Sequence, residues 1–366
     1  MSAHINPNVF LIFTPDGIVL WDFEKHNQYS LAPEYTFRLV DIAYKRYAIA
    51  RDDKIDIDLQ GQNIIAEHPF SRPEWGWDIL ARIFHVGTKD IPQEMIPING
   101  REWASCHTAL CIETAKNRIP PFKQPRSTAT LSLPRPDPAV LNSKTLWQSL
   151  LERRTCRKFR QEKISLQTLS TILYASFGFL DEREPGINEF VPKYLRQRRS
   201  SPSGGGLNST EVYLFCNRVS DLGPGTYHYD PVTHGLTSIR ETARENVLPS
   251  LLMGQYFSAE LAFGVFIAGR FDRMWWKYGH SRAYRVSLLD VGHLSQTFQL
   301  VSTACGLKTW LSAAFRDSEV EELLEIKSPA EQVLLFVGAG YSDGEDIDTA
   351  SREILTEYSM TNAHET

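Results

Sequence analysis

Two arginines and a run of glycines are the residues of this chain best suited to hold a cofactor. Arg153 and Arg157 stand four positions apart in the segment ERRTCRKF, residues 152–159. We expect this segment to begin a helix, on which that spacing turns both guanidinium groups to one side. There each arginine can make paired hydrogen bonds to a phosphate. The positive end of the helix would also attract the anion.

The glycines stand in RRSSPSGGGLNSTEVYLF, residues 198–215. Glycine has no Cβ, so its backbone can adopt positive φ and lie flat against a planar ligand. A phosphate anchor together with bare backbone for a ring system indicates a site for flavin mononucleotide (FMN). Taken alone, the two segments would more commonly be a solvated basic turn and a flexible loop.

Composition sets the broad class of the protein. The 366 residues are 42% hydrophobic and 23% charged, which is typical of a soluble globular protein and long enough for two domains. A net charge of −5 argues against a general nucleic-acid binder. The five cysteines have irregular spacing, which favours neither a disulfide framework nor a zinc ribbon. Without a signal peptide or an apolar run that could span a membrane, we expect a cytoplasmic protein with no membrane partner.

A proline-rich segment divides the elements that must position these residues. Before it, Val9–Phe13 and Ile18–Asp22 flank a Pro-Asp-Gly turn and predict a hairpin, and a helix is predicted from Pro33. Six prolines between 120 and 138 disfavour a helix there. We therefore predict an N-terminal module over residues 1–120, a linker over 121–140 and a second domain over 141–366.

The second domain has the pattern of a mixed α/β fold. Helices are predicted over 146–152, over 165–177 with Ser165 as its cap, and over 284–306. Strands are predicted over 211–217, 260–271 and 332–338.

Four segments, in order, resemble one known family. They are ERRTCRKF, PSGGGLNSTEVYLF, GPGTYHYD at 223–230, and YRVSLLDVGHLSQTFQLVSTACGLKTWLSAAF at 284–315. Together they resemble the SagB-type (thiazole/oxazole, azoline) dehydrogenase branch of the FMN-dependent nitroreductase superfamily. The resemblance implies an α+β, nitroreductase-like FMN-binding fold. The N-terminal hairpin and helix resemble the winged-helix modules that bind leader peptides.

The resemblance also implies a set of FMN-binding residues, and a backbone amide of the glycine loop that points at flavin N5. Asn208 departs from the histidine of many relatives, and the acidic YSDGED near the C-terminus replaces a basic pair. Gln296 shares a helix with Asp290 and His293, a polar stripe that either contacts the flavin or ties a dimer interface together, with structural use favoured over catalysis. The implied set is Arg153, Arg154, Thr155, Arg157, Pro202, Ser203, Gly204, Gly205, Asn208, Gln296, Ser312, Ala313 and Ala314.

Three residues are candidates for the proton-transfer group. Relatives carry a Lys-Tyr pair shortly before the glycine loop, and here Lys193 and Tyr194 precede it at a longer spacing. A desolvated lysine can have its pKa lowered into a useful range, although Lys193 is as well explained as an exposed loop residue. Tyr284, at the start of the later helix, is the third candidate. The segment RMWWKYGH, residues 273–280, either grips a peptide or aromatic group or packs between subunits.

The resemblance implies an FMN-dependent oxidoreductase that dehydrogenates a heterocycle or residue in a ribosomally synthesised peptide, with dioxygen reoxidising the flavin. Its expected partners are the peptide, through its leader, a cyclodehydratase or other tailoring enzyme, and a second copy in a homodimer. The alternatives are flavin-dependent hydroxylation of a side chain such as tryptophan, and a NAD(P)H-dependent nitro or quinone reductase. A non-enzymatic scaffold for a cyclodehydratase fits less well, because the glycines and arginines are intact.

Overall fold

The chain forms two compact units, residues 1–103 and 104–366. The computed structural model describes residues 3–44, 48–71, 74–92, 96–118, 120, 130–182, 197–241 and 247–362. Each unit has its own hydrophobic core. The two are therefore described separately.

The first unit contains a three-stranded antiparallel meander. Its strands β2 (Val9–Thr14) and β3 (Gly17–Asp22) pair with Thr14 opposite Gly17, so the predicted hairpin is confirmed. Gly17 has φ +134°, a conformation that L side chains rarely adopt, which explains glycine after the Pro-Asp pair. The other elements are β4 (Asn27–Leu31), a β1–β5 pair (His4–Ile5, Ile65–Ala66), and helices α1 (Pro33–Ala43), α2 (Lys54–Gly61) and α3 (Ile79–Gly87).

Helix α1 is the predicted helix from Pro33, and it buries the face that the pattern indicated. Leu39 and Ile42 are buried with Leu20 of β3 and Leu59 of α2 in the core of this unit. Proline at the start of α1 costs no hydrogen bond, because the first amides of a helix have no partner within it. The winged-helix likeness and the predicted domain limits stay predictions.

The second unit is built on a seven-stranded sheet in which every neighbouring pair is antiparallel. The predicted strands over 211–217, 260–271 and 332–338 are three adjacent strands of its interior. In spatial order the strands are β13 (Lys308–Ser312), β14 (Glu331–Gly340), β12 (Phe263–Arg270), β9 (Thr210–Cys216), β10 (Gly225–Asp230), β11 (Gly235–Glu241) and β6 (Thr130–Ser132).

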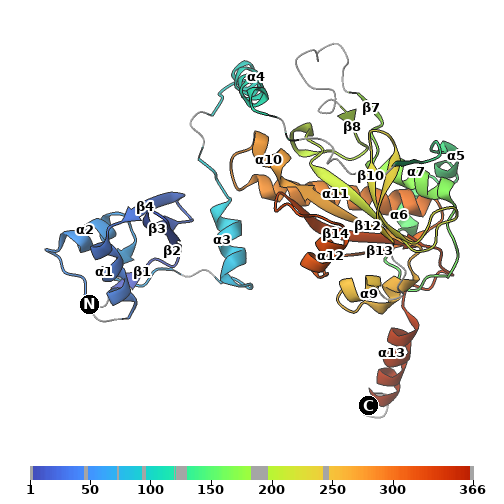
Figure 1. The fold of residues 1–366 in the computed structure, drawn as a ribbon. Helices are drawn as coiled ribbons and strands as arrows, with labels where there is room; N and C mark the ends of the chain where they lie inside the picture. The colour runs from blue at the N-terminus through green and yellow to red at the C-terminus, as the bar shows by residue number, and fades with distance from the viewer. Residues whose placement is uncertain are drawn as a thin grey trace. The chain divides into compact units, whose positions relative to one another are not determined.

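Helices cover both faces of this sheet, which confirms the mixed α/β class (Figure 1). Strand β9 shows how one strand serves two layers, because its side chains alternate between the faces. Leu214 joins the core under α7 (Leu166–Phe177) and α11 (Ala283–Ala304). Phe215 joins the core under α9 (Val247–Leu251) and α12 (Asp317–Leu323). The sheet is thus the central layer, and it positions both the glycine-rich segment before β9 and the arginine segment beside β13.

The helices predicted over 146–152, 165–177 and 284–306 form close to those limits. Ser165 caps α7 by accepting a hydrogen bond from the Thr168 amide at 3.0 Å. Of the predicted linker, residues 121–129 lie outside the described part, whereas Thr130–Ser132 pair with β11 and Pro138–Leu141 form α5. The remaining elements are α4 (Gly100–Lys116), α6 (Leu146–Glu152), β7 (Asp181–Glu182), β8 (Gln197–Arg198), η1 (Gly204–Gly206), η2 (Tyr256–Glu260), α10 (Phe271–Lys277) and α13 (Thr349–Asn362).

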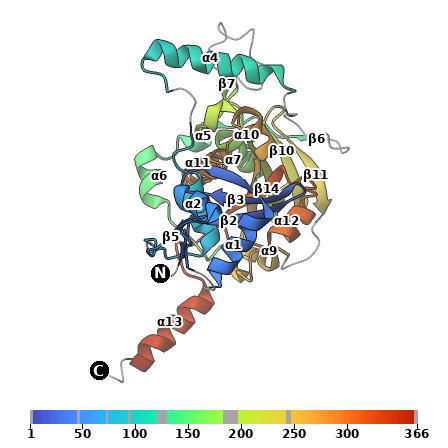
Figure 2. The same cartoon turned by 90° about the vertical axis from the view of Figure 1, so that its left-hand side faces the viewer.

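Helix α13 runs outward from the sheet in both views (Figures 1 and 2). Among the described residues, no helix combines the length and the apolar character needed to cross a membrane.

The core under α11 is centred on Phe298, which is fully buried between Phe177 and Phe263 with ring centroids 5.9 and 5.8 Å away. Phe298→Ala leaves a cavity, so we expect the free energy of unfolding of this unit to fall by about 3–5 kcal/mol. His293→Ala, at an exposed position of the same helix, is the control and should change it by less than about 0.5 kcal/mol. Urea denaturation measures both, and equal effects would contradict this packing.

Candidate functional site

The glycine loop is held by a carboxylate of α11. Asp290 accepts a hydrogen bond from the Ser203 hydroxyl at 2.8 Å and from the Gly204 amide at 3.0 Å. Ser203 Oγ in turn accepts from the Asn208 amide at 3.0 Å, which closes the loop on itself. Backbone hydrogen bonds within the loop also occupy the amides of Gly206 and Leu207. The loop is therefore an ordered turn and differs from the flexible loop considered above.

Two of the glycines are required by their surroundings. A Cβ on Gly204 would collide with the side chain of Val286, so only glycine lets the loop approach α11 this closely. Gly205 has φ +60°, and a Cβ there would collide with the Tyr278 hydroxyl. Gly205 is also exposed, as is Pro202 before it. The turn thus presents bare backbone to the outside.

Asp290 is the residue of the predicted polar stripe that the loop uses. Burial raises its pKa, while the hydrogen bonds from Ser203 and Gly204 act in the opposite direction. This role in positioning the loop agrees with the structural use that the sequence favoured. Gln296 and His293, further along α11, are exposed, and the contact between Gln296 and a flavin stays a prediction.

A buried charge network, which the sequence patterns did not predict, supports the other end of the loop. Glu211, the second residue of β9, accepts hydrogen bonds from His228 at 2.8 Å, from Arg273 at 2.9 Å and from Arg270 at 3.2 Å. Arg273 also donates to the backbone carbonyl of Asn208 at 2.9 Å. The sequence did hold a signal for this network. Glu211 stands in a mostly apolar strand, and Arg270 and Arg273 stand at and just after the end of a buried strand.

The arginines and the histidine of this network keep Glu211 ionised. Burial alone would raise the pKa of Glu211, but Arg273, His228 and Arg270 outweigh it and lower the pKa to about 2. Nearby, burial lowers the pKa of Arg199 to about 10. Arg199 donates to the Thr210 hydroxyl at 2.6 Å. The loop therefore rests on ionised groups that are shielded from water.

Asn208 ends the loop with its side chain turned inward. It has φ +47°, and its carboxamide donates to the Gln197 carbonyl at 3.0 Å. Only 3% of the residue is exposed. Its observed contacts are therefore within the protein, and its contact with a cofactor stays a prediction.

The arginine segment does not begin a helix, and that expectation is wrong. Helix α6 ends at Glu152, and Arg153 already has extended φ and ψ of −64° and 113°. Beyond it, Thr155 bridges in parallel to Thr309 of β13, and the Cys156 amide donates to the Thr309 carbonyl at 2.9 Å. Pairing with the edge strand of the sheet satisfies backbone groups that a helix would otherwise satisfy.

The extended conformation still places the same three side chains together. Alternate residues of an extended chain point to the same side. This pattern puts Arg153, Thr155 and Arg157 on one face, and the buried Cys156 on the opposite face. Arg154 instead pairs with Asp346 at 2.8 Å. A phosphate at this segment would therefore meet side chains of an extended strand. The positive end of a helix, which the sequence led us to expect there, does not contribute.

Strand β13 brings the arginine segment and the 312–314 turn to one edge of the sheet. The Ser312 hydroxyl accepts a hydrogen bond from the Ala314 amide at 3.0 Å and from Gln255 at 3.2 Å. Ala313 and Ala314 are exposed. The amide and carbonyl of Ala314 are thus occupied by Ser312 and Gln255, and contact between this turn and a cofactor stays a prediction.

The arginine segment and the glycine loop of one chain lie far apart. Thr155 pairs with Thr309 of β13, which in turn pairs with Ala339 of β14. Thr210, at the start of β9, pairs with Gly269 of β12, which in turn pairs with Gln332 of β14. The two sites are thus seven residues apart along β14. Seven residues along a strand span roughly 23 Å, and the four strand spacings from Thr155 across β13, β14 and β12 to β9 add roughly 19 Å sideways. This separation exceeds the length of a single FMN.

The candidate proton-transfer residues are divided between described and undescribed parts. Lys193 and Tyr194 lie outside the described residues. Tyr284 is 40% exposed at the start of α11, with its ring 5.2 Å from that of Phe271. It stands two residues before Val286, which contacts the glycine loop, so it lies near the exposed turn.

The nitroreductase family matches residues 150–341, more than half of the chain, and the chain therefore belongs to that family. It is an oxidoreductase of mixed α/β fold, as the sequence predicted. It is 31% identical over 191 residues to a protein of Methanocaldococcus jannaschii named as a putative nitroreductase. It is 29% identical over 189 residues to the microcin B17-processing protein McbC of Escherichia coli, and 26% over 220 residues to the trifolitoxin operon protein TfxC of Rhizobium leguminosarum.

These matches differ in how much of each protein they cover. They take in 52% of this chain for the archaeal protein, 49% for the microcin protein and 59% for the trifolitoxin protein. The chain spans 88% of the archaeal relative, but only 63% and 61% of the other two. The matches confirm the recognition of the nitroreductase superfamily and agree with its SagB-type branch.

The buried network predicts a defined response to acid. Because folding lowers the pKa of Glu211 from 4.5 to about 2, its contribution is complete above pH 4.5 and is lost as the pH falls towards 2. Glu211→Gln should lower the free energy of unfolding at pH 7 by about 3–5 kcal/mol, because Arg270 and Arg273 lose their charged partner. It should also flatten the dependence of stability on pH in that window.

Glu319→Gln is the matched control, because Glu319 makes a surface pair with Arg316 at 2.8 Å with both side chains about half exposed. It should change stability by less than about 1 kcal/mol. Urea denaturation at several pH values measures both variants. A Glu211→Gln protein with the wild-type pH profile would contradict the assigned role of the network.

Proposed function

We propose that this protein binds FMN and dehydrogenates a heterocycle or residue within a peptide. The observation that carries the proposal is the ordered glycine turn. Gly204 and Gly205 must be glycine because a Cβ on either would collide with the protein. The turn therefore exposes main chain without side chains. A flat, polar strip of main chain suits the face of a tricyclic ring. The alternating face of Arg153, Thr155 and Arg157 suits the phosphate of the same cofactor.

The Gly205 amide is the donor that we assign to flavin N5. Acceptors within the protein already occupy the amides of Gly204, Gly206 and Leu207, and Gly205 is exposed. A fixed donor at that place stabilises negative charge without reorganising during the reaction. Asp290, through its hydrogen bonds to Ser203 and Gly204, acts as the positioning residue for this amide.

The cofactor site is proposed to form between two copies of the chain. Because the arginine segment and the glycine loop of one copy lie farther apart than FMN extends, the segment of one copy would face the loop of its partner. A homodimer with twofold symmetry then contains two equivalent sites.

The proposed reaction is the conversion of an azoline to an azole. Two hydrogens leave the substrate ring, one as a hydride and one as a proton. Bound FMN supplies the hydride acceptor, and dioxygen is the proposed final oxidant. Lys193, Tyr194 and Tyr284 are the proposed candidates for taking the proton.

Similarity to proteins named for microcin B17 processing and for the trifolitoxin operon supports a peptide substrate. With such a substrate, the first unit is proposed to bind a leader peptide, and a cyclodehydratase is the proposed supplier of the azoline. The second candidate is a NAD(P)H-dependent reductase, favoured by the 31% identity to the archaeal protein named as a nitroreductase.

The reaction is tested by following the flavin colour of the FMN-supplemented full chain under anaerobic conditions. We expect little bleaching with NADPH and prompt bleaching with a synthetic thiazoline-containing peptide, whose product is lighter by two hydrogens. A product heavier by one oxygen on readmission of air indicates hydroxylation, and prompt bleaching by NADPH indicates the reductase. Protein that stays colourless after supplementation would rule out the FMN proposal.

The shared site is tested by mixing two defective variants. Arg157→Ala removes a phosphate ligand, and Gly205→Ala strains the turn and collides with Tyr278, so each homodimer should bind FMN at least about tenfold more weakly. After unfolding and refolding together, half of the dimers are mixed and each mixed dimer keeps one intact site. About a quarter of the sites should therefore recover full affinity.

Arg316→Ala, which removes an arginine from an exposed surface pair, serves as the control and should bind FMN as the wild type does. Equilibrium dialysis measures the fraction of tight sites. No recovery in the mixture would mean that each site is built from one chain.

A further inference from the structure

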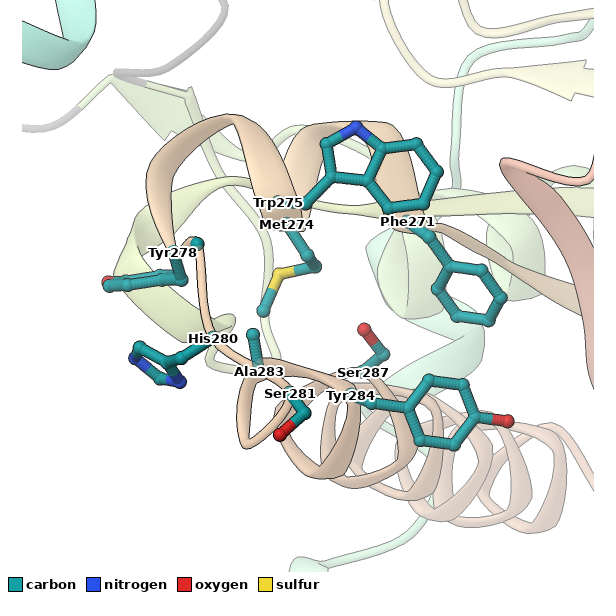
Figure 3. A pocket seen from close by; sticks show the side chains of 10 residues that line it. Phe271, Met274, Trp275, Tyr278, His280, Ser281, Ala283, Tyr284 and Ser287 are labelled. Atoms are coloured by element: carbon teal, nitrogen blue, oxygen red, sulfur yellow. The ribbon is translucent and has the colours of Figure 1, made fainter. Parts of the chain in front are cut away.

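A cavity of about 320 Å³ lies between α10 and the start of α11. Trp275 and Phe271 on α10 face Tyr284 and Ser287 on α11 across it (Figure 3). None of the described residues that line it carries a carboxylate, ammonium or guanidinium group. The walls are therefore rich in aromatic rings and include the imidazole of His280.

The cavity shares a wall with the glycine turn. Tyr278 and Met274 line the cavity, and a Cβ on Gly205 would collide with the Tyr278 hydroxyl, while a Cβ on Gly204 would lie 3.7 Å from Met274 Cε. The side chain of Tyr278 separates the cavity from the turn. Burial raises the pKa of its hydroxyl, which favours the neutral form. A group held in the cavity would thus lie next to the ring-binding backbone of the proposed function.

One buried polar group faces the cavity without a partner. Ser287 is fully buried, and its hydroxyl makes no hydrogen bond within the protein. In Figure 3 that hydroxyl points from α11 towards α10. On the same helix the Ser295 hydroxyl donates to the Gly292 carbonyl at 2.9 Å and the Thr303 hydroxyl to the Gln299 carbonyl at 2.8 Å, whereas the Ser302 hydroxyl is also unpartnered but does not line the cavity. A buried hydroxyl without a partner indicates a partner supplied from outside.

We propose that this cavity receives an aromatic side chain of the substrate peptide that carries an N–H or O–H group, an indole or a phenol, and that Ser287 hydrogen-bonds to that group. The proposal rests on the proposed function and specifies its substrate. The volume is at the lower end of ligand pockets and suits one large side chain rather than a length of peptide. Aromatic walls favour a ring, which packs edge to face or offset against them. Ser287 then determines specificity by distinguishing tryptophan and tyrosine from phenylalanine.

The test uses N-acetylated, C-amidated Gly-X-Gly peptides, with X as tryptophan, tyrosine, phenylalanine or leucine, titrated calorimetrically into the FMN-supplemented full chain. The tryptophan and tyrosine peptides should bind roughly 3- to 10-fold more tightly than the phenylalanine peptide, and the leucine peptide most weakly. Ser287→Ala should abolish the advantage over phenylalanine. Trp275→Ala, at a 57% exposed position, should weaken all three aromatic peptides by about 3- to 10-fold.

Ser302→Ala is the matched control, because Ser302 is also fully buried on α11 with an unpartnered hydroxyl but does not line the cavity. It should keep the wild-type order of affinities. Equal affinity for the tryptophan and phenylalanine peptides, or no binding of any aromatic peptide, overturns the proposal. So does dissociation of a dimer by Trp275→Ala in sedimentation, which would mean that a second copy covers the cavity.

The two proposals fail separately. Yellow, FMN-bound protein that does not select indole or phenol peptides rejects the cavity proposal and leaves the cofactor in place. Colourless protein that still selects these peptides, and loses the selection in Ser287→Ala, rejects the flavin proposal alone.

Discussion

The site depends on the hydrogen bonds that the Asp290 carboxylate accepts from the Ser203 hydroxyl and the Gly204 amide. They fix a glycine-rich turn against a helix, where such a sequence would otherwise sample many backbone conformations. Because the acceptor is buried and charged, the bonds are strong and their loss leaves a carboxylate without compensation. Both the bare backbone of the turn and the wall that Tyr278 forms beside it follow from this anchor.

A second carboxylate, Glu211, fixes the other end of the same turn by a different route. It gathers Arg270, Arg273 and His228 from β12, α10 and β10, and Arg273 passes the constraint to the Asn208 carbonyl. Hydrogen bonds between buried charged groups are strong, so a network of this kind rigidifies its surroundings. The turn is thus held between two buried anions that different strands and helices supply.

Local patterns predicted the elements of the fold well. The hairpin before Asp22, the cap at Ser165 and the strand over 211–217 are each determined by neighbouring residues, and each formed as expected. The arginine segment was mispredicted because its conformation depends on pairing with β13, a strand about 150 residues later in the chain. The Glu211 network could not be derived either, because its members meet only when β9, β10 and β12 are adjacent. Lys193 and Tyr194 lie outside the described residues, so the sequence remains the source of that assignment.

The pairing of Thr155 with Thr309 has a consequence for solubility. Strand β13 is the last strand of the sheet on its side, and an uncovered last strand offers its amides and carbonyls to any similar strand of another molecule. The residues around Thr155 shield that border, and they are also the ones proposed to grip a phosphate. A ligand bound to this short stretch would therefore also oppose self-association of the sheet through β13.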